Sequence, residues 1–262
     1  MAEGAKGAAS LRSVRGRVAL ITGAAHGMGR ATAMLFAADG AHVAVTDRDG
    51  GAAAETAAAI KAQGGSAQAW TLDVTDAAGI SRVTQDVAET FGGLDILINN
   101  AGVSARLAID HPDYESNWIR VLDILLTAQQ RLVRAALPYL RQSDAARIVN
   151  IASTEALGGT AYNTAYAAAK AGVVGLTRTL AVELGREAIT VNCICPGPIL
   201  TELTKKISEE DRAKFARRRT ALGRYGVAEE VAHMTLSLCL PAASYVTGVI
   251  LPVDGGLTAR NA

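Results

Sequence analysis

A tyrosine and a lysine stand four residues apart, at Tyr166 and Lys170, in a segment typical of a helix. Residues at positions i and i+4 share a helix face, so the Lys170 ammonium can lie beneath the Tyr166 ring and near its hydroxyl. A cation there stabilises the phenolate and lowers the tyrosine pKa from its usual value of about 10, as a general acid or base requires. On its own, such a pair is more often a solvated surface contact.

A serine precedes the tyrosine by thirteen residues. Ser153 follows the apolar run 148–152, which is expected to be a buried strand. Its hydroxyl can hold the carbonyl or alcohol oxygen of a substrate opposite Tyr166. We therefore predict that Ser153, Tyr166 and Lys170 are catalytic and that the chemistry transfers a proton to or from a substrate oxygen.

A glycine-rich turn near the start of the chain predicts a phosphate site. The apolar run 18–21 leads through this turn into a helical segment at 30–36. Glycines let the chain turn sharply and let a ligand approach backbone amides, while the helix that follows points its free N–H groups at the same place. The same glycines could serve only tight helix–sheet packing. We predict that the turn binds a pyrophosphate through Gly23, His26, Gly27, Met28 and Gly29.

An acidic residue, Asp47, follows the second expected strand, at 41–46. At this place in a dinucleotide-binding fold, a carboxylate accepts hydrogen bonds from the adenosine ribose and repels a 2′-phosphate. Asp47 therefore favours NAD over NADP, although it could instead cap a helix starting near Gly51. Arg48 and His26 argue the other way, because either side chain could meet a phosphate.

Strands and helices alternate along the rest of the chain. Further strands are expected at 67–72, 94–98, 147–152, 189–194 and 248–253, and helices at 52–63, 80–91, 118–140, 165–184 and 227–240. Right-handed crossovers place the helices of such an alternation on both faces of one parallel sheet. The fold class is therefore α/β. A single domain is expected, since no linker interrupts the chain.

Composition narrows the class of protein. Half of the 262 residues are hydrophobic and the formal net charge is +1, which favours neither nucleic acid nor an anionic membrane as a partner. Three cysteines without C-x-x-C spacing indicate a reducing compartment and no zinc or other metal site. No window is apolar enough to span a membrane. We expect a cytoplasmic protein with a disordered tail at 1–15 and one domain at 16–262.

Several motifs together resemble the short-chain dehydrogenase/reductase family. They are T-G-x-x-x-G-x-G at 22–29, N-N-A-G at 99–102, Ser153, Y-x-x-x-K at 166–170, and Pro196-Gly197 with Thr201, in the family's order over about 18–256. The resemblance implies a Rossmann-type fold with a seven-stranded parallel sheet and an NAD(P)-dependent oxidoreductase that interconverts a secondary alcohol and a ketone. It implies Tyr166 as the acid/base, Lys170 also as a ribose ligand, and Ser153 as the residue that orients the substrate.

The resemblance also extends the cofactor site. It implies that Asp73 and Val74 lie at the adenine ring, although Asp73 alone could equally cap a helix beginning at Asp76. In the N-N-A-G motif the asparagines would tie neighbouring strands. Further contacts are implied for Asn100, Ala101, Gly102, Pro196, Gly197, Ile199 and Thr201. A homotetramer is implied through the helices 116–140 and 162–184.

The segment 200–224 corresponds to the family's substrate loop. Arginines 217–219 within it could meet an anionic substrate, but such a run is more often a solvated helix face. Glu155, Tyr162 and Asn163 lie near the expected pocket and hint at polar ligands.

One position departs from the family pattern. The family carries an Asn seven residues after a Trp and twenty-eight before the catalytic Ser, and both Trp118 and Ser153 place that position at Leu125. The Asn helps hold a water that connects the lysine to solvent, so Leu125 puts the proton relay in doubt. Backbone carbonyls or Gln129, one turn along, could still hold such a water. The leading hypothesis is an NAD-dependent oxidoreductase. The alternative is a catalytically impaired protein that binds or senses NAD(H).

Overall fold

The computed structural model describes residues 11–202 and 204–260, and a parallel seven-stranded sheet forms its centre. The strand order is β3-β2-β1-β4-β5-β6-β9. The strands are β1 (Val18–Thr22), β2 (His42–Asp47), β3 (Ser66–Thr71), β4 (Ile96–Asn99), β5 (Arg147–Ile151), β6 (Thr190–Pro196) and β9 (Ile250–Val253). The expected single-domain α/β Rossmann fold is confirmed.

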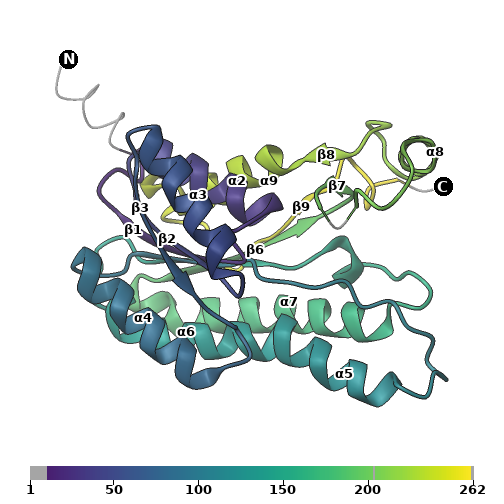
Figure 1. Ribbon diagram of the computed structural model, residues 1–262, viewed down its shortest axis with the longest axis horizontal. Helices are drawn as coiled ribbons and strands as arrows, with labels where there is room; N and C mark the ends of the chain where they lie inside the picture. The colour runs from purple at the N-terminus through teal and green to yellow at the C-terminus, as the bar shows by residue number, and fades with distance from the viewer. Residues whose placement is uncertain (1–10, 203, 261–262) are drawn as a thin grey trace.

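Helices cover both faces of this sheet (Figure 1). One face carries α2 (Gly27–Ala38), α3 (Gly50–Ala62) and α9 (Ala228–Cys239), and the other carries α4 (Ala77–Phe91), α5 (Tyr114–Leu122), α6 (Ala128–Leu140) and α7 (Thr164–Leu184). Residues of β1 alternate between the two cores: Ala19 and Ile21 pack toward α2, whereas Val18 and Leu20 pack toward α4 and α6. Burial on both faces explains the continuous apolar runs in the sequence.

The order of the strands reverses direction at β1. From β1 the chain builds outward through β2 and β3, then returns to place β4 on the other side of β1. In sheets of this kind ligands bind outside the carboxyl ends of the strands at such a switch point. The glycine turn after β1 and the Asn-Ala-Gly segment after β4 both lie there.

The expected helix at 118–140 contains a π-helical turn. α5 runs without a break through this turn, η1 (Asp123–Thr127), into α6. A π turn inserts an extra residue into the helical path and is often found at functional sites. Leu125 is fully buried at its middle, so the position that departs from the family pattern lies in this bulge.

The ordered chain begins earlier than residue 16. Val14 is fully buried in the core beneath α2, and its N–H donates to the Asp39 carboxylate at 2.6 Å. The prediction of a disordered tail over 1–15 is therefore wrong for 11–15, because burying Val14 fixes this segment. Residues 1–10 lie outside the described residues.

The substrate loop has structure of its own. Two short strands, β7 (Ile199–Leu200) and β8 (Gly226–Val227), pair with each other, and α8 (Glu209–Arg219) lies between them in the sequence. All three are at one end of the molecule (Figure 1). The first turn of α8 is acidic and its last turn holds arginines 217–219, which suits the helix dipole. This arrangement favours the solvated-helix interpretation of the arginines. Leu203 of this loop lies outside the described residues.

Across 11–202 and 204–260, no helix combines the length and the apolar character that crossing a membrane requires.

Candidate active site and cofactor cleft

A cavity of about 700 Å³ runs along the carboxyl ends of the central strands. This volume lies within the range of small-molecule and cofactor sites. Most of the predicted cofactor residues line it: Gly23, His26, Gly27, Met28, Gly29, Asp47, Arg48, Asp73, Val74, Asn100, Ala101, Gly102, Tyr166, Lys170 and Thr201. The predicted residues Ser153, Pro196, Gly197 and Ile199 do not line it.

The N-terminus of α2 opens into this cavity with its amides free. His26 is the N-cap but makes no side-chain cap hydrogen bond, and the first turn carries no acidic residue. Gly23 has a φ of +64°, and a Cβ there would lie 2.8 Å from the Cα of Ala101. The turn is therefore packed against the end of β4 and also presents free N–H groups. A helix terminus of this kind fits an anionic phosphate, so the residues present suit the pyrophosphate of a dinucleotide.

Asp47 is fixed at the rim of the cavity by two backbone groups. Its carboxylate accepts from the Ala25 N–H at 3.2 Å and from the Asp49 N–H at 3.1 Å. The cap of α3 is Asp49, whose side chain accepts from the Ala52 N–H at 3.0 Å. Asp47 is therefore not a helix cap, and the structure leaves it at the predicted ribose position.

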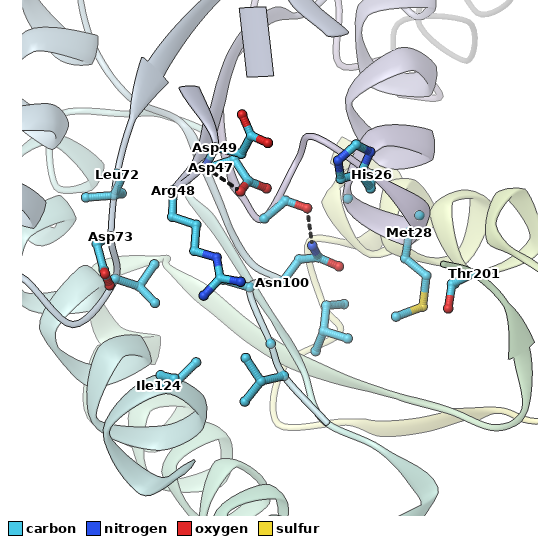
Figure 2. Close-up of a pocket in the computed structure, with 18 of the residues that line it drawn as sticks. His26, Met28, Asp47, Arg48, Asp49, Leu72, Asp73, Asn100, Ile124 and Thr201 are labelled. Carbon is cyan, nitrogen blue, oxygen red and sulfur yellow. Dashed lines mark hydrogen bonds between the residues drawn. The ribbon is translucent and has the colours of Figure 1, made fainter. Parts of the chain in front are cut away.

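Arg48 extends into the middle of the pocket, between Asp73 and Asn100 (Figure 2). Asp73 accepts hydrogen bonds from the N–H and the hydroxyl of Thr75, and these bonds, together with the charge of Arg48, lower the pKa of Asp73. The cap of α4 is Asp76, not Asp73. Asp73 and Arg48 thus form the polar wall of the predicted adenine end.

The two asparagines of the N-N-A-G motif join three strands. Asn99 donates to Asn150 Oδ1 at 2.8 Å, which ties β4 to β5. Asn100 donates to the carbonyl of Thr22 at 2.8 Å and to that of Gly23 at 3.1 Å, which ties the chain after β4 to β1 and to the glycine turn; Figure 2 shows the second of these bonds. These bonds hold the backbone that the cofactor is predicted to lie against.

Tyr166 and Lys170 lie together at the end of the cavity beside β5, which we call its inner end. The outer end is the one beside β2, where Asp47 lies. The Lys170 ammonium is 5.7 Å from the centre of the Tyr166 ring and donates to the carbonyl of Ile151 at 2.7 Å. Ser153 caps the short 3-10 helix η2 (Thr154–Ala156), and its side chain lies near enough to the Tyr166 hydroxyl to lower the pKa of that group. The structure thus brings the three predicted catalytic residues together.

The electrostatics of the pair differ from the sequence expectation. Burial raises the pKa of Tyr166, the Ser153 side chain opposes this rise, and the negative charge of Glu155 adds to it. Burial also lowers the pKa of Lys170 to about 8. The expected lowering of the Tyr166 pKa is therefore wrong for this arrangement, because desolvation of the phenol has the largest effect on it and raises it.

Several residues of the cavity wall were not predicted from the sequence. They are Asp49, Leu72, Thr75, Val103, Arg120, Ile124, Ile151, Ala152 and Glu202. Arg120 lies in the last turn of α5 and Ile124 lies four residues on, inside the π turn, and both line the cavity. Their i and i+4 spacing beside Leu125 was the signal that could have identified them.

Leu125 occupies an apolar contact between the helices. It packs with Val121, Ala165 and Ala169, and a Cβ on Gly102 would lie 3.5 Å from it. One turn along, Gln129 is only 2% exposed, and neither atom of its amide has a hydrogen-bond partner among the described residues. A buried amide needs partners, and such a polar site suits an internal water.

Comparison with known proteins places this site in a wider group. A family model described as enoyl-(acyl carrier protein) reductase matches residues 23–258. A 3-oxoacyl-[acyl-carrier-protein] reductase of Thermotoga maritima is 38% identical over 244 residues, which cover 93% of this chain and 98% of that protein. The meso-2,3-butanediol dehydrogenase of Serratia marcescens is 37% identical over 245 residues, covering 94% and 96%. A (2S)-[(R)-hydroxy(phenyl)methyl]succinyl-CoA dehydrogenase subunit of Thauera aromatica is 38% identical over 243 residues, covering 93% and 97%.

Proposed function

Because this chain belongs to the short-chain dehydrogenase/reductase family and is an enzyme acting on CH–OH or keto groups, we propose that it is an NAD-dependent oxidoreductase interconverting a secondary alcohol and a ketone. One observation carries the proposal. A single cavity has Tyr166 and Lys170 at its inner end and the free N-terminus of α2, with Asp47, at its outer end. A dinucleotide bound at the outer end would bring its nicotinamide to the tyrosine.

The chemistry divides between cofactor and side chains. The nicotinamide, when bound, supplies the exchange of a hydride with the substrate carbon. Tyr166 gives or takes the proton at the substrate oxygen, and Ser153 holds that oxygen opposite the tyrosine. Lys170 is held beneath the ring by the Ile151 carbonyl, where its positive charge favours the phenolate form.

The preference for NAD is proposed on the position of Asp47. Two backbone N–H groups fix its carboxylate at the cavity rim, and its remaining lone pairs can accept from ribose hydroxyls. The negative charge would also repel a 2′-phosphate. Arg48 is the counter-evidence, since its guanidinium reaches into the same cavity and could pair with such a phosphate (Figure 2).

A second function is favoured by one observation, the leucine at position 125. If the buried Leu125 interrupts the path of protons to Lys170, the protein would bind or sense NAD(H) with impaired turnover. Against this alternative, the structure keeps Ser153, Tyr166 and Lys170 together. A protein without turnover has no need of all three.

Two wider features are proposed with the function. The helices α5 and α7 expose large apolar side chains, Ile119 at 67% and Val182 at 83%, and this supports a homotetramer formed through these helices. All three cysteines are free thiols, which fits a cytoplasmic protein.

A dehydrogenase screen tests the proposal directly. Purified protein would be given NAD or NADP with secondary alcohols, polyols, sugars and hydroxysteroids, while the absorbance of the reduced nicotinamide is followed. We expect turnover with NAD for at least one class of secondary alcohol. Binding of NAD by calorimetry without turnover would support the sensing alternative, and failure to bind either dinucleotide would contradict both.

A further inference from the structure

Glu155 stands beside the predicted chemistry without a role in it. It lies two residues after Ser153, in the short helix η2, and its backbone N–H donates to Ser153 Oγ at 3.2 Å. A substrate oxygen held by Ser153 is therefore within one helical turn of Glu155. Groups attached to the reacting carbon can therefore approach this residue.

The carboxylate of Glu155 is fixed by a single neighbour. The Thr160 N–H donates to its Oε2 at 3.0 Å, and the Thr160 hydroxyl donates to its Oε1 at 2.7 Å. None of the ion pairs found within 11–202 and 204–260 includes Glu155. The carboxylate is thus held in one orientation, and no salt bridge neutralises its charge.

The field of this carboxylate reaches the reacting groups. Burial raises the pKa of Tyr166 most, and the negative charge of Glu155 adds to that rise. Negative charge on Cys195 of β6 would act in the same direction, whereas the Lys170 ammonium, 5.7 Å from the centre of the Tyr166 ring, carries the opposite charge. A substrate between Ser153 and Tyr166 would therefore feel a negative potential on its Glu155 side.

We propose that Glu155 sets the charge specificity of the enzyme, disfavouring substrates with an anionic group within a few bonds of the reacting carbon and favouring neutral, hydroxylated or cationic substituents there. The inference rests on the proposed function, because it takes the reacting carbon to lie between Ser153 and Tyr166. Two like charges about 5 Å apart repel enough, even at the dielectric constant of water, to change relative binding about fourfold, and by more where water is partly excluded.

Three variants separate charge from shape. Glu155→Gln removes the charge and keeps both contacts, since the amide oxygen can accept from the Thr160 N–H and the amide nitrogen can donate to the Thr160 hydroxyl. Thr160→Val removes one of the two contacts and keeps the charge. Glu89→Gln removes an equal charge from an exposed position on α4, as a control for net charge.

The substrates form a charge series on one short ketone. They are acetoacetate, its neutral methyl ester, and the cationic 1-aminopropan-2-one, each assayed for kcat/KM with reduced nicotinamide dinucleotide. The ester-to-anion ratio of wild type should fall at least about fourfold in Glu155→Gln, and the ratio of cation to ester should fall with it. Both ratios should stay near wild type in Thr160→Val and Glu89→Gln. An unchanged ratio in Glu155→Gln, or an equal change in Thr160→Val, would overturn the inference.

Binding separates this inference from the proposed function. Ligand-observed NMR would measure the same three compounds against wild type and Glu155→Gln in the presence of reduced nicotinamide dinucleotide. If wild type turns over none of the three but binds the ester better than the anion only while Glu155 is present, the charge filter stands and these ketones are not its substrates. Binding that ignores charge, or no binding of any of the three, overturns the filter.

Discussion

The two ends of the cavity are built from different parts of the chain. At the outer end the groups predicted to meet the cofactor are mostly backbone, supplied by the turn before α2 and by strand ends that Asn100 ties together. At the inner end they are side chains, with Tyr166 and Lys170 projecting from α7. A backbone site constrains the sequence mainly to glycine, whereas a side-chain site can change at a single residue, as Leu125 illustrates. A match to the glycine motif therefore supports binding and says less about turnover.

The largest effect should come from removing the hydroxyl of Tyr166. Tyr166→Phe keeps the ring and its packing, so kcat should fall by the roughly 10²–10⁴-fold that general acid/base catalysis supplies, or more, while NAD affinity is unchanged. Steady-state kinetics and calorimetry on one preparation measure both. Tyr245→Phe makes the same chemical change at a fully exposed residue outside the cavity wall and should leave kcat unchanged. A Tyr166→Phe enzyme with near-wild-type kcat would place the chemistry elsewhere.

At the outer end, cofactor choice should depend on Asp47. Wild type should bind NAD more tightly than NADP, and Asp47→Ala should narrow the gap by about 1.5–3 kcal/mol for each hydrogen bond lost to the charged carboxylate. Dissociation constants for both dinucleotides test this. Asp76→Ala is the control: it removes the cap of α4, at about 1 kcal/mol of stability, and should leave selectivity unchanged because Asp76 does not line the cavity. A wild-type preference for NADP would show that Arg48, not Asp47, sets the choice.

Burial of Lys170 should be visible in the pH dependence of stability. Its pKa falls from the usual 10.5 to about 8, so between these values the folded protein binds fewer protons than the unfolded chain. The contribution of Lys170 to the free energy of unfolding is therefore unfavourable below pH 8 and rises with pH across this window, by about 3 kcal/mol at about 1.4 kcal/mol per pKa unit. Lys170→Met should lack this rise.

Urea unfolding of wild type and Lys170→Met at neutral and alkaline pH provides the measurement. Near neutral pH the variant should be more stable than wild type, although losing the hydrogen bond to the Ile151 carbonyl reduces this gain in stability. Its turnover should fall. Lys61→Met, at an exposed position near the end of α3, should follow wild type at every pH. If the curves for wild type and Lys170→Met ran parallel, the lysine would not be desolvated.

The smallest effect on turnover is expected at Leu125. The buried amide of Gln129 can hold a water, so Leu125→Asn should leave kcat and its solvent isotope effect unchanged. It should cost about 1–3 kcal/mol of stability, because a buried leucine is replaced by an amide. Kinetics in light and heavy water, with thermal unfolding to confirm folding, decide this. Gln129→Leu should slow turnover, and a rise in kcat for Leu125→Asn would instead favour an interrupted relay.

Most of the fold was predictable because buried parallel strands have a recognisable sequence pattern. β1, β4, β5 and β6 are buried on both faces, so their sequences are nearly continuous apolar runs. The π turn at 123–127 was not predictable, since one additional residue leaves the apolar spacing of a long helix almost unchanged. Val14 was missed because a single buried residue has no periodicity.

The candidate site was predictable in its residues and less so in its energetics. The positions of Asp47, Tyr166 and Lys170 follow from where strands end and from the i and i+4 spacing of a helix. The pKa of Tyr166 does not, because desolvation depends on which other segments cover the ring. The place of Arg120 in the cavity wall depends in the same way on tertiary packing, because it is the contact between α5 and α7 that brings α5 to the site.

The packing of α2 against α9 joins segments that are far apart in the sequence and are therefore synthesised at different times. Val231 and Leu238 of α9 complete the same core that holds Phe36 of α2, and the Ala242 N–H donates to the carbonyl of Leu11 at 2.9 Å. During synthesis, the half of the chain with the predicted nucleotide site therefore emerges with one apolar face uncovered, and that face stays uncovered until α9 has left the ribosome. Contacts this distant in sequence slow folding. A chain stopped before α9 would carry every motif of the predicted cofactor site and would still expose the apolar face that α9 covers, where chaperones and proteases can act.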